Sequence, residues 1–161
     1  MSNQDAGWLA ERFRGLSFVQ PSALAMPFAD NSFDLVFSSA LIEHAGNSEN
    51  QKQLLKECAR VARRFVFLTI PNRYHPMKFH TALPLIHVLP KKTNRAILKK
   101  LSMDFFAQEE NLNLLSKRDM LILARQAWAS GAFGKVLNSC ALYTERFLGI
   151  PLNLLLFARK G

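Results

Sequence analysis

Two pairs of polar residues follow apolar runs of the sequence directly. The first pair is Glu43 and His44, and the second is Asn72 and Arg73. Because ligand sites in open α/β sheets form at the carboxyl ends of the strands, we expect both pairs at one sheet edge. His44 has the chemistry of a general base for a hydroxyl or amine, and Arg73 that of a clamp for phosphate or carboxylate. The structural alternative, in which Glu43 binds backbone donors and Arg73 is an ordinary surface residue, stays open.

Metal and disulfide chemistry are not indicated by the sequence. His75, His80 and His87 lie in a proline-broken stretch that offers no carboxylate to orient them, and no Cys/His cluster has zinc-ligand spacing, so we predict no metal site. Cys58 and Cys140 are expected to be buried or half-buried thiols, which suits a reducing compartment. The polar N-terminus and the short apolar runs likewise favour a cytoplasmic protein.

The elements that must position these residues form a strand–helix–strand unit. Residues 33–38 and 65–70 are apolar runs bounded by turn formers, a pattern typical of strands buried on both faces. Between them, helical spacing begins near Ser48, which with Gln51 makes a capping-box pattern, and continues to about residue 62. This order predicts two parallel strands joined by a right-handed crossover.

The remaining elements are less regular. Ser116 and Asp119 form a second capping-box pattern, opening a helix that Gly131 would end. A short helix is expected at residues 8–14, a short strand at 16–19, and an antiparallel hairpin from strands near 135–143 and 152–159. We expect one domain over residues 1–161.

Residues 73–115 are predicted to form a lid over one end of the sheet. Three prolines break this stretch, and Thr93 is expected to cap a helix that ends near Met103. The chain carries a net charge of +9, and no acidic residue occurs between Glu57 and Asp104. Such a field attracts phosphate, acidic lipid or nucleic acid, although a solvated basic face without a partner is equally compatible. Aromatic residues are not interleaved with the basic ones, so we expect no specific nucleic acid partner.

Four segments in order resemble class I S-adenosylmethionine-dependent methyltransferases, of the type 11 kind. They are residues 23–36 (ALAMPFADNSFDLV), 38–44 (SSALIEH), 54–61 (LLKECARV) and 69–73 (TIPNR). The resemblance implies a Rossmann-like sheet of order 3-2-1-4-5-7-6, S-adenosylmethionine as cofactor and a small-molecule acceptor. Here the sheet would be incomplete, with strands 3 to 7 and flanking helices, mainly parallel with an antiparallel C-terminal hairpin.

The departures from the family pattern concern the cofactor. None of the seven glycines makes the Gly-x-Gly loop that lets the backbone approach the cofactor closely. The family's adenine-contacting aspartate falls on Ser22, which is uncharged and shorter. Site residues carried over from the resemblance fall into three groups: Ser22, Ala23, Leu24, Ser38 and Ser39 for the cofactor, His44 for catalysis, and Asn72, Arg73 and His80 for the acceptor.

The sequence therefore predicts a methyltransferase that lacks the N-terminal strands and is weak or inactive alone. The alternative is a non-catalytic remnant or interaction protein whose basic lid binds anionic partners. The apolar stretch at residues 81–90, within the acid-free region, suits an anionic or amphiphilic acceptor and peripheral membrane contact. A strand left at the sheet edge would favour poor solubility or a homodimer through that edge.

Overall fold

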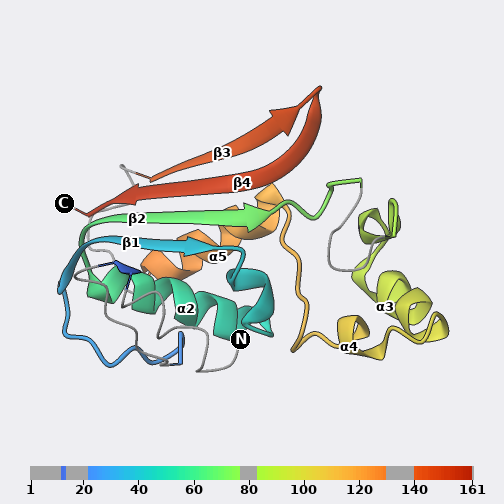
Figure 1. Cartoon of the computed structure of the whole chain (residues 1–161), viewed down its shortest axis with the longest axis horizontal. Coiled ribbons are helices and arrows are strands. Elements are labelled where there is room, and N and C mark those ends of the chain that lie inside the picture. The colour runs from blue at the N-terminus through green and yellow to red at the C-terminus, as the bar shows by residue number, and fades with distance from the viewer. Residues whose placement is uncertain (1–11, 14–21, 77–82, 130–139, 161) are drawn as a thin grey trace.

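A mixed four-stranded sheet forms the centre of the protein. The computed structural model describes residues 12–13, 22–76, 83–129 and 140–160. Within them the strand order is β1-β2-β4-β3, with β1 parallel to β2, and with β4 antiparallel to both β2 and β3 (Figure 1). Three strands thus share one direction, which confirms the predicted incomplete Rossmann-like sheet with its C-terminal hairpin. The strands are β1 (Phe33–Ser39), β2 (Ala62–Pro71), β3 (Cys140–Phe147) and β4 (Ile150–Arg159).

Two helices cover one face of this sheet, as Figure 1 shows. They are α2 (Ser48–Val61), the crossover between the parallel strands, and α5 (Lys117–Ala129). The apolar stripe of α2 packs against alternate residues of β2, so that Leu54, Leu55 and Leu68 are almost completely buried. Four shorter elements lie at the carboxyl ends of the parallel strands and beyond: η2 (Ile42–His44), η3 (Ile86–Val88), α3 (Lys91–Lys100) and α4 (Asp104–Ala107).

The opposite face of the sheet is not covered by any described element. The β1 side chains on this face are exposed, with Leu35 at 52% and Phe37 at 58%. Phe37 stacks on Phe67, and Phe65 on Phe157, each pair with ring centroids 5.6 Å apart. The expectation that the strand at 33–38 is buried on both faces is therefore wrong within the described residues, because only the face toward α2 has a covering layer.

Two of the predicted helix starts differ from the structure. Asn47, and not Ser48, caps α2, since its side chain accepts a hydrogen bond from the Asn50 amide at 2.9 Å. Gln51 cannot serve as the capping partner because its side chain is buried and donates to the Ile42 and Asn113 carbonyls. Helix α3 begins two residues before Thr93, directly after Pro90, because the fixed φ of proline suits a first helical turn.

Other predicted features are confirmed. Ser116 and Asp119 make the reciprocal hydrogen bonds of a capping box at the start of α5, since the backbone amide of each donates to the side chain of the other. The late strands form an antiparallel hairpin, but its turn is tighter than expected, since Leu148 and Gly149 alone connect β3 to β4, both with positive φ. The helix expected at residues 8–14, the strand at 16–19, Gly131 and the start of the third strand at 135–139 lie outside the described residues, except for residues 12–13.

Both cysteines are free thiols, Cys58 buried and Cys140 half-buried, as expected. Burial raises the pKa of Cys58 to about 12 and that of Cys140 to about 11, so neither is a reactive thiolate near neutral pH. None of the helices in the described part of the chain is both long and apolar enough to cross a bilayer.

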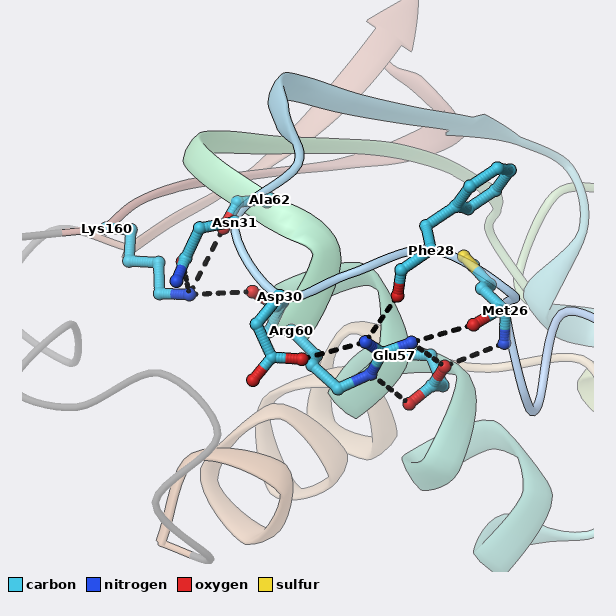
Figure 2. Close-up of polar contacts among 9 residues, drawn as sticks. Met26, Phe28, Asp30, Asn31, Glu57, Arg60, Ala62 and Lys160 are labelled. Carbon is cyan, nitrogen blue, oxygen red and sulfur yellow. Dashed lines mark hydrogen bonds and ion pairs between the residues drawn. The ribbon is translucent and has the colours of Figure 1, made fainter.

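The loop that leads into β1 is held by one arginine of α2 (Figure 2). Arg60 donates to the Met26 carbonyl at 2.9 Å and to the Phe28 carbonyl at 2.7 Å. Its guanidinium also forms a two-pronged pair with Glu57, both distances 2.8 Å, and an ion pair with Asp30 at 2.8 Å. Glu57 in turn accepts from the Met26 amide at 2.8 Å. We call this network of Glu57, Arg60 and the loop the loop clamp.

Lys160 forms a second set of hydrogen bonds near the loop clamp, also drawn in Figure 2. The Lys160 ammonium donates to the Asn31 side chain at 2.6 Å and to the Ala59 and Ala62 carbonyls at 3.1 Å each. Two of these acceptors are carbonyls at the C-terminal end of α2, where a cation also suits the helix dipole. The end of β4 and the start of β1 are thereby joined to the same helix terminus.

Residues 83–114 form a small unit with its own apolar cluster, centred on Ile86, Leu98 and Ala107. Figure 1 shows α3 and α4 of this unit beyond the carboxyl ends of β1 and β2, and not on either sheet face. The chain leaves and re-enters the main body at one place, because the Arg73 amide donates to the Leu115 carbonyl at 3.0 Å.

The loop clamp generates a stability prediction. Glu57→Gln should lower the free energy of unfolding by about 2 kcal/mol at pH 7, since charged hydrogen bonds to Arg60 are lost. The hydrogen bond to Arg60, opposed by burial and aided by the Met26 amide, lowers the pKa of Glu57 below its usual 4.5. The wild-type contribution is thus full above pH 4.5 and lost as the pH falls further. Urea unfolding at several pH values, followed by circular dichroism, measures both effects.

Glu49→Gln is the matched control, because Glu49 lies on the same helix but its side chain is 76% exposed beside Lys52. Its free energy of unfolding should change by no more than about 0.5 kcal/mol. Equal losses for both variants, or an unchanged acid limb in Glu57→Gln, would contradict a structural role for the clamp.

Candidate active site

The carboxyl ends of β1 and β2 are joined by contacts between their last residues. Ser39 and Thr69 share a hydrogen bond between their hydroxyl oxygens at 2.8 Å, and the Ala40 amide donates to the Thr69 carbonyl at 2.9 Å. Ala40 has φ of 48°, so the chain turns sharply here into η2. The turn places Glu43 and His44 at the sheet edge, as expected from the sequence.

His44 is oriented by a backbone contact from a distant part of the chain. Its Nδ1 lies 2.7 Å from the Asn111 carbonyl oxygen, which can only accept, so the ring proton is on Nδ1. Nε2 then carries the lone pair of the neutral ring and lies 4.0 Å from Oε1 of Glu43. The His44 side chain is 35% exposed, whereas that of Glu43 is fully buried. This geometry suits His44 as a base acting through Nε2.

Asn113 connects the unit of residues 83–114 to the turn after β1. Its amide N–H donates to the Glu43 carbonyl at 2.7 Å, and its side chain donates to the Gly46 carbonyl at 2.9 Å. Its carbonyl accepts from Gln51 at 2.8 Å, and its Oδ1 accepts from Lys91 at 2.7 Å. A fully bonded, buried asparagine of this kind holds the loop of His44 in place.

Asn72 and Arg73 both lie at the exit of β2, but their side chains have different partners. Asn72 is buried, and its Oδ1 accepts from the Tyr74 amide at 3.1 Å. The Arg73 guanidinium donates to the His87 carbonyl at 3.0 Å and to the Leu89 carbonyl at 2.6 Å. Both residues line a groove of about 660 Å³, whose other wall is the start of α5 from Ser116 to Asp119. That volume is in the range of small-molecule sites.

The predicted site residues do not all meet in one place. His44 is not among the residues that line this groove. His80 lies outside the described residues. In the part of the chain that the structure describes, no three His, Cys, Asp or Glu side chains could hold a metal ion together.

The residues expected to contact the cofactor lie on two segments. Ser22 forms a local turn, since its Oγ accepts from the Leu24 amide at 3.2 Å. Gln53 of α2 donates to the Leu24 carbonyl at 3.3 Å, which places this turn beside the first half of the helix. Ala23 and Leu24 pack against the main core. At the end of β1, Ser38 is half-buried and Ser39 is engaged with Thr69.

The described glycines do not provide an open cradle for S-adenosylmethionine. A Cβ on Gly46 would meet the Asn50 side chain at 3.3 Å and the Glu110 backbone at 3.7 Å, so this glycine is packed against protein atoms. Gly149 faces open space but lies in the hairpin turn between β3 and β4. The described residues therefore do not supply the glycine cradle that the whole group would need.

Two residues of this region were not singled out from the sequence. Asn111 and Asn113 hold His44 and its loop, yet they occur in an ordinary-looking stretch, NLNLL. The one available signal is the alternation of asparagine with leucine, since a polar residue within an apolar run must find buried partners. Nothing in the local spacing links this stretch to His44, which is 67 residues away.

The orientation of His44 generates a spectroscopic prediction. Long-range ¹H–¹⁵N correlation spectra at a pH where the ring is neutral should show the proton on Nδ1, because the Asn111 carbonyl is the partner. His75, at the exit of β2, provides an internal comparison in the same spectrum. A proton found on Nε2 of His44 would contradict the geometry described here and would remove the basis for a base at that atom.

Comparisons with known proteins agree with this architecture. Residues 2–68 match the family model described as a methyltransferase domain. No curated protein matches the sequence. A SAM-dependent methyltransferase from Methanosarcina mazei is 15% identical with a TM-score of 0.52, covering 98% of this chain and 78% of that protein. A possible histamine N-methyltransferase from Thermotoga maritima is 15% identical with a TM-score of 0.53, covering 96% and 70%.

A third solved structure, magnesium protoporphyrin IX methyltransferase from Synechocystis with bound SAH, is 12% identical with a TM-score of 0.51. The match covers 98% of this chain and 59% of that protein. At these identities the likeness concerns the fold, and the order β1-β2-β4-β3 corresponds to strands 4-5-7-6 of the expected sheet. The resemblance found in the motifs is confirmed at this level: the chain has the fold of class I methyltransferases, and its residues 2–68 match the methyltransferase domain model.

Proposed function

We propose that this chain forms the acceptor side of an S-adenosylmethionine-dependent methyltransferase that acts on a small molecule. The observation that carries the proposal is the groove of about 660 Å³ at the exit of β2, lined by Asn72 and Arg73. It lies at the carboxyl edge of a sheet with the class I methyltransferase strand order, which is where α/β folds bind their ligands.

In this proposal the acceptor occupies the groove, and the residues around it position and deprotonate it. Arg73 would attract an anionic group of the acceptor, and Asn72 lines the groove beside it. His44 takes up the acceptor proton at Nε2 while its Nδ1 stays bonded to the Asn111 carbonyl. Since His44 does not line the groove, this role requires that the acceptor extend from β2 toward the turn after β1. His80 remains a proposed acceptor contact.

The cofactor would supply an activated methyl group, and the residues described here would hold only one edge of it. Ser22, Ala23, Leu24, Ser38 and Ser39 are the proposed contacts. Because the sequence has no Gly-x-Gly and neither described glycine offers an open cradle, the affinity of these contacts alone should be low. In this proposal, full activity needs cofactor contacts beyond those that the described residues offer.

A titration followed by amide chemical shifts tests the cofactor edge. S-adenosylmethionine should bind with a dissociation constant of about 1 mM or weaker, with shifts concentrated at the five proposed contact residues and absent from the hairpin of β3 and β4. Shifts in the hairpin alone, or none at saturating cofactor, would overturn the cofactor proposal. S-adenosylhomocysteine provides the parallel titration, because it shares the adenosine.

A second candidate function is a non-catalytic interaction protein. The specific observation in its favour is the local use of Ser22, whose hydroxyl already accepts from the Leu24 amide, together with the packed surroundings of Gly46. The absence of any cofactor-dependent shift in the same titration would favour this candidate. The two free thiols suit a cytoplasmic location for either function.

We further propose that residues 73–115 act as a lid that recognises an amphiphilic acceptor or touches a membrane surface. An apolar groove of about 360 Å³ lies between η3 and α3, with Leu85 and Leu101 largely exposed at its rim. Exposed Lys99 and Lys100 follow on the same helix. An apolar surface beside basic residues is the combination that amphiphiles and anionic bilayers select.

We also propose that two copies of the chain associate through the outer edge of β1. No described strand pairs with the outer side of β1, and its Leu35 and Phe37 side chains are exposed. Leu35→Lys should weaken self-association about tenfold, because charge on an edge strand opposes pairing. Sedimentation equilibrium over a range of concentrations measures this.

Tyr143→Lys is the matched control for the edge, since Tyr143 is 63% exposed on β3, at the opposite edge of the same sheet. It should leave the association constant unchanged. Equal weakening by both substitutions would indicate that the open sheet face, and not the β1 edge, joins the copies. No association at any concentration would refute the homodimer.

A further inference from the structure

A small cavity lies between the exit of β2 and the unit of residues 83–114. Its volume is about 30 Å³, which corresponds to two or three oxygen-sized positions at roughly 10–15 Å³ each. The cavity is distinct from the groove described above, although Arg73 lines both. The polar lining consists of Arg73, His87, Lys91, Asn94, Arg95 and Asn113, and the rest is apolar.

Three of these lining residues are cations that come from two different parts of the fold. Arg73 belongs to the main body, whereas Lys91 and Arg95 are one helical turn apart on α3. Arg95 has a carboxylate partner, Glu109, at 2.9 Å. The hydrogen bonds of Arg73 and Lys91 go to neutral oxygens, namely two backbone carbonyls and the Asn113 side chain. Around this cavity, positive charge therefore exceeds the negative charge in direct contact with it.

Burial increases the cost of this arrangement. It is the main cause that lowers the pKa of Lys91, and repulsion from Arg73 and Arg95 acts in the same direction. Asp119 and Glu109 oppose the shift by attraction. Like charges gathered in a half-buried place are unfavourable unless something negative joins them.

The geometry of the donors is also suited to an oxygen-rich anion. Arginine offers a planar fork of N–H groups, and lysine a compact ammonium, and both are the usual partners of carboxylate and phosphate oxygens. Asn94 and Asn113 are buried beside them, with amide groups already held by protein partners: Asn94 donates to the Ile86 carbonyl at 2.9 Å, and Asn113 to Gly46. These two walls are thus held in place, and the three cationic residues line the same space.

We propose that this cavity binds a small oxyanion, a carboxylate or phosphate group, through Arg73, Lys91 and Arg95. An anion there would join the main body to α3 electrostatically. It could be a free ion or the acidic group of the acceptor. The second source rests on the proposed function, whereas binding of the free ion does not.

Calorimetric titration of the full chain with inorganic phosphate, at constant ionic strength kept by sodium chloride, tests the site. Saturable binding is expected with a dissociation constant on the order of 1 mM, and acetate serves as the carboxylate arm. Saturation by phosphate alone assigns the site to phosphate groups, and saturation by acetate as well assigns it to carboxylates too. No saturation by either ion at about 50 mM, far above that constant, would overturn the proposal.

Substitutions on α3 localise the binding. Lys91→Gln should weaken it about tenfold, whereas Lys92→Gln should change it less than about twofold, because Lys92 is exposed and does not line the cavity. Both substitutions remove one positive charge from the same helix, so equal effects would show a diffuse basic surface and overturn the site.

Lys91→Arg keeps the charge and guards against a mere folding defect. It should retain binding within about threefold of wild type, and circular dichroism should show the same helix content in all three variants. Loss of binding in Lys91→Arg with the fold intact would count against a charge-based site. The cofactor titration is independent of these measurements, so phosphate binding without cofactor binding would retain this site and refute only the methyltransferase proposal.

Discussion

The loop clamp on Arg60 is the interaction on which the position of the sheet edge depends. The described residues before β1 lie outside the four-stranded sheet, and their part-buried carbonyls at Met26 and Phe28 need donors from elsewhere in the protein. A single guanidinium supplies those donors, and Glu57 holds it in orientation. Because the Asn31 amide also donates to the Arg60 carbonyl at 2.9 Å, the start of β1 is set relative to the end of α2. From there β1 runs parallel to β2, and Ser39 pairs with Thr69 where β1 ends.

At the other end of the same strands, the site is held by contacts that cross the chain. The turn after β1 carries His44, and the asparagines that hold this turn, Asn111 and Asn113, lie at the C-terminal end of the unit of residues 83–114. That unit leaves the body after Arg73 and returns at Leu115, so one short pairing determines where its polar residues lie. The two ends of β1 are thus held by different contacts. The loop clamp holds the start of the strand, and Asn111 and Asn113 hold His44 and the turn that follows its end.

In the fold, the basic residues of one acid-free stretch have two different environments, solvent and a small cavity. In the sequence, the basic residues between Glu57 and Asp104 form one acid-free stretch. In the structure, Lys92, Lys99 and Lys100 are exposed to solvent, whereas Arg73, Lys91 and Arg95 line one small cavity. A solvated lysine costs little free energy, whereas cations gathered in a half-buried place are unfavourable unless an anion pairs with them. The aromatic rings of Phe37, Phe67 and Phe157 likewise lie on a sheet face that no described element covers.

Elements with local signals could be predicted from the sequence alone. The apolar runs of β1 and β2, the helical stripe of α2 and the capping box of Ser116 and Asp119 each depend on neighbouring residues, and the ordered motifs indicated the fold family. Tertiary structure decided what depends on distant partners. Gln51 is a buried donor and Asn47 is the cap of α2, while α3 begins at Lys91 and Asn111 is the partner of His44. The role of each side chain follows from the groups that packing places against it. Spacing along the chain does not specify those groups.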